Sequence, residues 1–231
     1  MADPAHLTDP LPRSISLVLV RHAETDWVAQ GRFQGTADTH LSLRGLDEAH
    51  AVARRLAEPA AAPALPLPVG SPVAIWHSPL HRAATTAHAI AEERGESKLL
   101  IASSDLEELS AGQWEGLTQA EIEKRWPLEL AAWRRDPAIA SPVGGETNAH
   151  AVRRVRRVIR EVVAGLDAAP SPGSVWGIVV SHDGVLRLAT LMLLALPGGR
   201  RPAFPFPPAA VTILERLGDG WQLRVHGLRA G

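Results

Sequence analysis

The stretch ISLVLVRHAET, Ile15–Thr25, decides the fold because it joins a buried strand directly to a group of polar side chains. Its first six residues are apolar except for Ser16. A Val- and Leu-rich run of this kind is typical of a strand with both faces buried. Arg21 and His22 follow without a spacer, at the carboxyl end of the strand, where open α/β sheets bind ligands. Taken alone, the pair is equally compatible with a strand that ends at the surface.

The composition limits the classes of partner and chemistry. The 231 residues are 45% hydrophobic and 21% charged, which is typical of a globular protein, and the net charge of −1 disfavours binding to nucleic acid or an anionic membrane. Without cysteine there are no disulfides, thiolate metal sites or cysteine nucleophiles. The N-terminal stretch lacks the apolar core of a signal peptide, and Leu186–Leu196 is too short to span a bilayer. We therefore predict a cytoplasmic protein.

Apolar runs and helical patterns alternate along the chain. The runs predict strands at Ile15–Val20, Val73–Trp76, Lys98–Ala102 and Val175–Val180, and a final hairpin at Val211–Glu215 and Gln222–Val225. Helices are expected at Leu43–Glu58, Leu80–Arg94, Thr118–Trp126, Leu128–Arg135 and Val185–Leu196. The alternation predicts an α/β fold, a three-layer α/β/α sandwich with a mostly parallel central sheet. We expect a flexible N-terminal arm at 1–13 and one domain at 14–231.

Two helices carry predictions about their faces. In the first, the residues expected to face the core are Leu46, Ala49, Ala53 and Leu56. A long helix capped by Thr147 or Asn148 reaches Leu166, with an apolar stripe of Val152, Val155, Ile159, Val162 and Leu166. Its arginines are Arg153, Arg154, Arg156, Arg157 and Arg160. A phosphate-binding face is one interpretation of these arginines, but we favour a solvated outer face, because helix surfaces commonly look like this.

Three predicted strand ends carry residues suited to phosphate chemistry. If the strands are parallel, Arg21-His22, Ser78 with Arg82, and Ser181-His182 meet at one sheet edge. Arginine binds phosphate oxygens in bidentate fashion, and neutral imidazole is a nucleophile that forms covalent intermediates. The acidic loop 105–108 can supply a proton to the leaving group.

A metal site is the rival interpretation of the clustered histidines. His77, His81 and His88 include an i,i+4 pair, to which His22 and His182 could add ligands. The HExxH pattern is absent, however, and the two arginines would repel a dication. We therefore predict neither a metal nor another cofactor.

The same residues resemble the histidine phosphatase superfamily, the phosphoglycerate mutase-like family. The matching segments are RHAET at 21–25, GRFQG at 31–35, SPLHRAATTA at 78–87, LEELSAGQWEG at 106–116, GGET at 144–147 and SHDG at 181–184. The resemblance implies a phosphoglycerate mutase-like fold in which His22 becomes phosphohistidine and Glu108 donates the proton. It also implies that Arg21, Arg82 and His182 hold the phosphoryl group. Glu115 is expected to be structural.

Three positions depart from the family pattern. Ala23 and Asp183 stand where the family usually has glycine, and Val28 stands where many members have a phosphate-binding asparagine. Either one phosphate contact is missing, or Gln34 or a backbone amide supplies it. We count Gln34 and Asp183 among the predicted substrate-binding residues. Asp183, close to the phosphate pocket, is expected either to shift His182 toward its charged form or to form local hydrogen bonds.

The resemblance covers phosphatases and mutases. The chain has no tyrosine and carries the phosphatase-like WEG, so we predict hydrolysis of a small-molecule phosphate ester by a phosphohistidine route without a metal. Phosphoglycerate mutase and a catalytically silent phospholigand-binding module are the alternatives. Segment 114–146, with Trp114, Trp126 and Trp133, is expected to form a lid that selects the leaving group. The terminal hairpin is a candidate edge for a homodimer.

Overall fold

The computed structural model describes residues 13–198 and 203–230 and places their strands in one six-stranded sheet. The strands are β1 (Ile15–Arg21), β2 (Ile75–His77), β3 (Leu100–Ala102), β4 (Val175–Ser181), β5 (Val211–Leu217) and β6 (Gly220–Leu228). Their order is β3-β2-β4-β1-β5-β6, with parallel pairing from β3 to β1 and antiparallel pairing at β5 and β6. The predicted, mostly parallel sheet with a terminal hairpin is confirmed.

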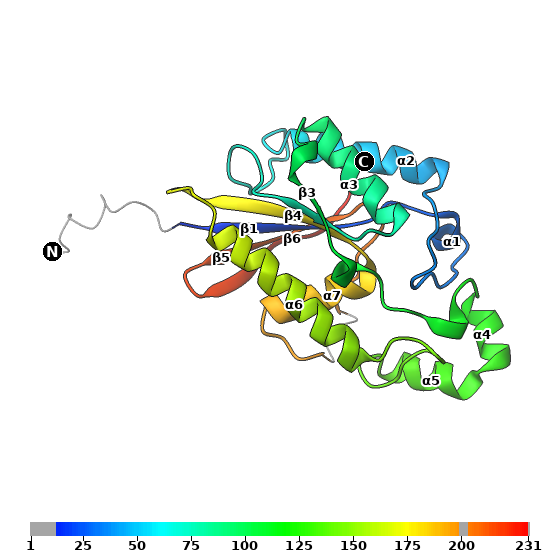
Figure 1. The fold of residues 1–231 in the computed structure, drawn as a ribbon. Helices are drawn as coiled ribbons and strands as arrows, with labels where there is room; N and C mark the ends of the chain where they lie inside the picture. Colours follow the sequence, from blue (N-terminus) through cyan, green and yellow to red (C-terminus); the bar gives the residue numbers. More distant parts are fainter. Residues whose placement is uncertain (1–12, 199–202, 231) are drawn as a thin grey trace.

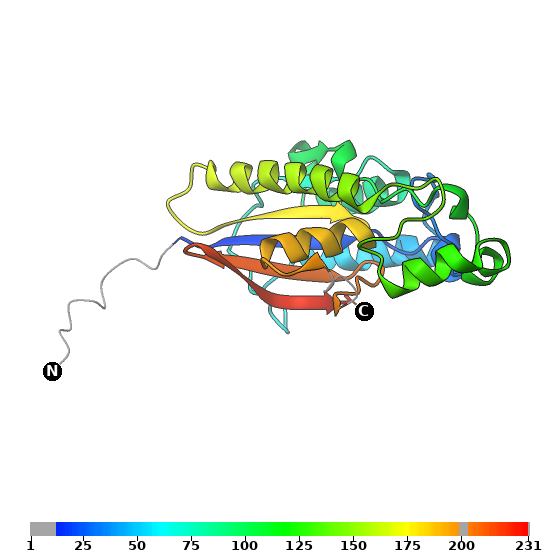
Figure 2. The same cartoon turned by 90° about the horizontal axis from the view of Figure 1, so that it is seen from below.

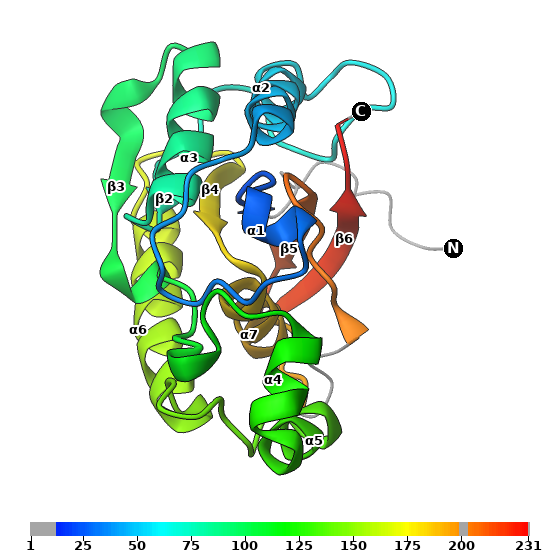
Figure 3. The ribbon, with the colours of Figure 1, turned by 90° about the vertical axis from the view of Figure 1, so that its right-hand side faces the viewer.

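Helices cover both faces of the sheet (Figure 1). They are α1 (Asp26–Ala29), α2 (Leu43–Ala57), α3 (His81–Glu93), α4 (Gln119–Arg125), α5 (Pro127–Arg135), α6 (Asn148–Asp167) and α7 (Asp183–Leu193). Short 3-10 helices lie at η2 (Ser97–Leu99), η3 (Ser104–Leu106) and η4 (Gly112–Trp114). Figure 3 shows α2 and α3 together on one side of the sheet, with α6 and α7 on the other. This is the predicted three-layer sandwich.

Strand β1 separates the two halves of the core. Leu17 and Leu19 pack with residues of α6 and α7, whereas Val18 and Val20 pack with residues of α2 and α3. Because successive side chains of a strand point to opposite faces, this division follows directly from the apolar run. The doubly buried strand predicted from the sequence is confirmed.

The prediction that Leu46 faces the core is wrong. Its side chain is 39% exposed, and α2 buries Gly45 together with Ala49, Ala53 and Leu56. A Cβ at Gly45 would lie 1.9 Å from the carbonyl oxygen of Glu24. The backbone of α2 therefore approaches the loop after β1 so closely that only glycine fits there, and this contact fixes the rotation of the helix.

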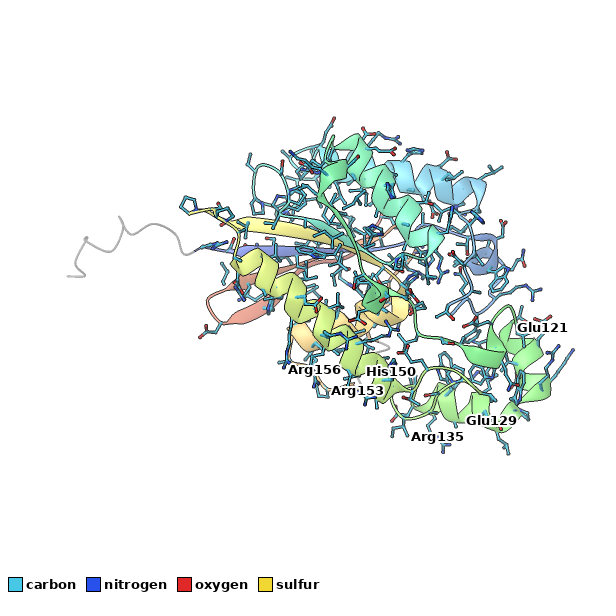
Figure 4. The ribbon with its side chains drawn as sticks, viewed as in Figure 1. Glu121, Glu129, Arg135, His150, Arg153 and Arg156 are labelled. Carbon is cyan, nitrogen blue, oxygen red and sulfur yellow. The ribbon has the colours of Figure 1, made fainter. Side chains whose placement is uncertain are left out.

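The prediction of a solvated face for all the α6 arginines is wrong at Arg154. Arg153, Arg156, Arg157 and Arg160 are exposed, but Arg154 is buried. Its guanidinium binds backbone carbonyls and a carboxylate in another part of the chain, so its burial is compensated by ion pairing and hydrogen bonds. Figure 4 labels Arg153 and Arg156 along α6.

The remaining differences from the predictions are local. The segment after Arg21 contains the four-residue helix α1, which was not expected; the Thr25 hydroxyl caps it by accepting the Val28 N–H. Most of the predicted 1–13 arm lies outside the described residues. Arg13, however, donates hydrogen bonds to the Leu166 and Ala169 carbonyls.

Helices α4 and α5 lie beyond the carboxyl ends of the parallel strands. Figures 1 and 2 agree on this placement, with α1 nearby. A small apolar cluster of Ala111, Trp114, Ile122 and Leu130 holds the two helices to the loop before them. The predicted lid segment is thus a packed unit on the ligand-binding side of the sheet.

Candidate active site

Strand register brings three strand ends to one edge of the sheet. Arg21 of β1 pairs with Ser181 of β4, and His77 of β2 pairs with Val180 of β4. The residues that follow, His22, Ser78 and His182, therefore leave neighbouring strands at nearly the same level. The convergence predicted from parallel pairing is confirmed.

His22 is a buried, neutral imidazole in a fixed orientation. Its side chain lines the cleft at this sheet edge, although the residue as a whole is only 2% exposed. Burial lowers the pKa of His22 well below its usual value, and the charges of Arg21 and Arg82 lower it further. Nδ1 lies 2.7 Å from the carbonyl oxygen of Ala23, which can only accept, so Nδ1 carries the proton. Nε2 is left with a free lone pair.

His182 is also buried and neutral, and its ring centre lies 5.1 Å from that of His22. Burial lowers its pKa well below the usual value, and Arg82, His22 and Arg21 add to this effect. The Ser78 hydroxyl accepts the Leu80 N–H and lies 2.8 Å from Nε2 of His182, so we assign the hydroxyl proton to that bond. Nδ1 then carries the ring proton, and it has no hydrogen-bond partner among the described residues.

Two buried guanidinium groups flank His22. Arg82 donates to the carbonyls of Gly35 and Ala37 at 2.8 and 2.7 Å, and Arg21 donates to the carbonyl of Phe206 at 2.7 Å. Burial lowers the pKa of both side chains, but arginine stays charged in proteins. The Nε atoms of both are buried without a partner among the described residues. The site therefore holds two fixed positive charges with unused donors, as an anion requires.

Glu108 faces this group from the loop after β3. It lines the same cleft, and its carboxylate accepts the backbone N–H of Leu109 at 2.9 Å and that of Gly184 at 3.1 Å. Gly184 lies in the first turn of α7, where backbone N–H groups have no partner within the helix. Both carboxylate oxygens are thus fixed by the backbone.

Asp183 forms local hydrogen bonds and does not shift His182 toward its charged form. Its carboxylate accepts from the Arg187 side chain at 2.9 Å and from the Phe206 N–H at 3.0 Å. The dominant influences on His182 are burial and the nearby cations, so the expected shift toward the charged form is wrong. The charge of Asp183 instead raises the pKa of Arg21, against the lowering effect of burial.

Val28 and Gln34 both line the cleft. Gln34 Oε1 accepts the hydroxyl protons of Thr25 and Thr39, so the amide nitrogen is the end that can donate to a ligand. Glu115 is half-buried, and its Oε1 accepts N–H groups from Thr36 and Ala111. This is the kind of loop-bracing contact expected of a structural residue.

The cleft has a volume of about 330 Å³ and extends from His22 toward the α4–α5 unit. Phe33, Trp133, Pro137 and Pro142 line its far part, and Trp133 packs edge-on against Phe33. Of the three tryptophans expected in a lid, Trp133 lines the cleft and Trp114 is fully buried beneath it. A phosphate ester of a small molecule fits a space of this size.

Glu146 and Arg154 are site residues that the sequence interpretation missed. Glu146 lines the cleft, and both of its carboxylate oxygens accept hydrogen bonds from Arg154 at 2.6 and 2.8 Å. A signal for the burial of Arg154 was present in the sequence. Ala151 lies three residues before it and Val158 four residues after it, so the three share one face of α6, and this face is buried.

Within residues 13–198 and 203–230, His, Asp and Glu side chains form no group of three that could hold a metal ion. His77 and His88 lie with ring centres 6.0 Å apart, and His81 stacks near His40. No helix in these ranges combines the length and apolarity that crossing a membrane requires.

Comparison with known proteins gives a consistent result. Over 197 residues the chain is 33% identical to glucosyl-3-phosphoglycerate phosphatase of Mycobacterium tuberculosis, covering 83% of this chain and 80% of that protein. Phosphoserine phosphatase 1 of Hydrogenobacter thermophilus is 33% identical over 148 residues, covering 64% of each chain. The solved structure of the mycobacterial glucosyl-3-phosphoglycerate phosphatase with VO3 superposes with a TM-score of 0.76 at 32% identity, covering 92% of this chain and 98% of that one. The model of the histidine phosphatase superfamily, branch 1, matches residues 17–229, and the chain belongs to this family.

Proposed function

We propose that the protein hydrolyses phosphate monoesters of small metabolites in two steps, with His22 as nucleophile and Glu108 as acid and base. The observation that carries the proposal is the state of His22, which is neutral, buried, and fixed with Nε2 free between two guanidinium groups. Family membership and the phosphatases among its relatives support hydrolysis of a small phosphorylated metabolite.

In the first step, Nε2 of His22 attacks phosphorus. The N–P bond forms as the P–O bond to the alcohol breaks, and the departing oxygen takes a proton from Glu108. The phosphoryl oxygens carry negative charge throughout, and Arg21, Arg82 and the Nδ1–H of His182 are the donors that stabilise it.

In the second step, water replaces the alcohol. Glu108, now a carboxylate, accepts a proton from the water as its oxygen attacks phosphorus and the N–P bond breaks. Inorganic phosphate leaves, His22 is again neutral, and Glu108 is again protonated. The guanidinium groups supply the positive charge that a metal provides in other phosphatases, so we propose that the reaction needs no metal.

The test combines activity with trapping of the intermediate. Phosphate release is measured over a broad panel of phosphomonoesters in the presence of EDTA, and labelled enzyme is isolated after a rapid quench. We expect activity with EDTA and a label that is stable in base and labile in acid, as an N–P bond is. The His22→Ala variant should lose about 10⁴-fold or more in kcat and carry no label.

His88→Ala is the matched control, because His88 is an exposed histidine on α3. Full activity of His22→Ala, or an acid-stable label, would contradict the proposal. Conversion of 3-phosphoglycerate to 2-phosphoglycerate without free phosphate would identify a mutase instead. A protein that binds inorganic phosphate but releases none from any ester would be a silent binding module.

A further inference from the structure

We propose that Arg154 is a positioning residue that holds the Glu108 carboxylate in place for protonation of the leaving group. This inference rests on the acid role proposed above for Glu108. Arg154 lies on α6, a helix that contributes none of the residues proposed to contact phosphate. It acts through the backbone of the loop that carries Glu108.

Three successive carbonyl groups of that loop are held by side chains from other elements. Nη1 of Arg154 donates to the carbonyl oxygens of Asp105 at 2.8 Å and Glu107 at 2.7 Å. The Ser181 hydroxyl, at the end of β4, donates to the carbonyl of Leu106 at 2.7 Å. The segment before Glu108 is therefore fixed to α6 and to the sheet by hydrogen bonds from two different elements.

The other edge of the same guanidinium binds the wall of the cleft. Nε and Nη2 of Arg154 donate to the two oxygens of Glu146 at 2.8 and 2.6 Å, and the two side chains are 9% and 10% exposed. Burial raises the pKa of Glu146, but hydrogen bonds from Arg154 and His150 outweigh this and lower it overall. A bidentate buried pair of this kind fixes direction as well as distance. Arg154 thus joins the cleft wall to the loop of the acid.

The position of the Glu108 carboxylate depends on this loop. Its two backbone donors come from Leu109, the next residue, and from Gly184 at the start of α7. If the backbone at Glu107 moves, the carboxylate either loses the Gly184 bond or turns away from the leaving oxygen. A displacement of about 1 Å in a catalytic group lowers the rate by about 10²-fold.

Arg157 offers a matched control on the same helix. It binds the side chain of Asp105, a residue whose carbonyl Arg154 binds, through a bidentate contact at 2.5 and 2.6 Å. Its side chain is 61% exposed and touches no loop carbonyl that the structure records. Removing Arg157 therefore leaves the carbonyls of Asp105 and Glu107 with their donors from Arg154.

The experiment compares two substrates that differ in how much acid assistance they need. Nitrophenyl phosphate has a good leaving group, whereas phenyl phosphate needs a proton on its departing oxygen. We expect Arg154→Lys, which keeps the charge but not the fork of donors, to lower kcat/KM for phenyl phosphate about 30-fold, which is less than the 10²–10⁴-fold that general acid catalysis contributes as a whole. The loss for nitrophenyl phosphate should be below about threefold, and Arg157→Ala should change neither value.

A second variant distinguishes a loss of positioning from a loss of folded protein in Arg154→Lys. In Arg154→Met/Glu146→Met both buried charges are removed together, a replacement that is often neutral for stability. We expect the same selective loss on phenyl phosphate and unchanged inhibition by inorganic phosphate. When Glu108→Gln is added, the selective loss should be no larger than that of Glu108→Gln alone.

Three outcomes separate this inference from the function on which it rests. Equal losses on both substrates, or no loss, while Glu108→Gln is selective, would overturn the role of Arg154 and leave the acid assignment standing. A Glu108→Gln variant that is not selective would overturn the acid assignment itself. Selective loss in Arg157→Ala would show that the loop responds to any perturbation, and would also overturn the proposal.

Discussion

The two ends of the cleft are built in different ways. The inner half, defined as Arg21, His22, Arg82 and His182, consists of three buried side chains and the half-buried Arg21. All four lie at or near strand ends and are held by backbone carbonyls and by Ser78. The outer half, defined as Phe33, Trp133, Pro137 and Pro142, is supplied by loops and by α5 of the α4–α5 unit. The inner half suits a group that never varies, the phosphoryl anion, and the outer half suits one that does, the alcohol.

This contrast predicts which substitutions lower the rate of hydrolysis for all phosphate esters and which change it only for some. Damage to the inner half should lower the rate with every phosphate ester. Damage to the outer half should change the order of preference among esters and leave affinity for inorganic phosphate as it was. Three of the four predictions below test this division, and the other tests the protonation state of the two buried histidines.

The largest effect is expected from Arg82. Loss of one donor to developing charge costs about 10²–10³-fold in rate, and Arg82→Met also leaves the carbonyls of Gly35 and Ala37 without their partner. We expect kcat/KM to fall about 10³-fold for every ester, with Arg82→Lys falling less. Steady-state kinetics on three unrelated esters check this; a loss confined to one ester would break the division.

The two buried histidines predict a pH dependence of stability. Because burial lowers the pKa of both His22 and His182 in the folded state, the unfolded chain binds more protons below about pH 6.5. Stability should therefore be unaffected by these groups above that pH and fall as the pH drops, by about 1.4 kcal/mol per pH unit for each histidine. Denaturant unfolding between pH 7 and 5 measures it, and His182→Gln should reduce the slope by one histidine's share; an unchanged slope would contradict the lowered pKa.

Trp133 tests the outer half. Trp133→Leu removes an aromatic wall of the cleft, and such a change in a pocket alters discrimination between substrates by about tenfold. We expect kcat/KM to change by that amount for bulky esters and to stay constant for the smallest ones. Inhibition by inorganic phosphate serves as the internal control, because the inner half is proposed to bind phosphate without Trp133; a weakened phosphate affinity would show that the halves are coupled.

Asp183 lies at the border of the two halves and should give the smallest effect. Asp183→Asn removes a negative charge near Arg21 but keeps an oxygen that can accept the Phe206 N–H. Affinity for inorganic phosphate should rise about threefold, since a charge in a partly solvated site contributes less than 1.4 kcal/mol. Titration with phosphate at two salt concentrations measures this, and a decrease in affinity would assign Asp183 to substrate binding.

The inner half of the cleft could be predicted from the sequence because most of its residues directly follow predicted strands. Arg21 and His22 directly follow a strand that the apolar run specifies, and Ser181 and His182 follow another. Once the strands are parallel, their ends must meet at one edge, whatever the details of packing. The protonation of each ring could not be predicted, because it depends on the Ala23 carbonyl and the Ser78 hydroxyl in three dimensions.

The two wrong predictions about helix faces concern residues whose environment is set by backbone from a distant part of the chain. In the sequence, Arg154 cannot be told apart from the four exposed arginines of α6. What distinguishes it is that it binds carbonyls about fifty residues earlier in the chain, and helical periodicity does not report such contacts. Leu46 fits the predicted apolar stripe of α2, but the close backbone contact at Gly45 rotates the helix so that Leu46 is partly exposed. Helical periodicity records which residues share a face and says nothing about backbone that approaches from elsewhere.

The place of β1 in the sheet has a consequence for how the molecule forms. The strand that delivers His22 starts at Ile15, yet its two neighbours start at Val175 and Val211. Pairings between such distant segments carry a large loop-closure entropy and slow the folding of a chain. During synthesis, the strand that carries the proposed nucleophile emerges early and stays without these partners until most of the protein has been made. The proposed phosphate site is therefore completed late in the folding of the chain.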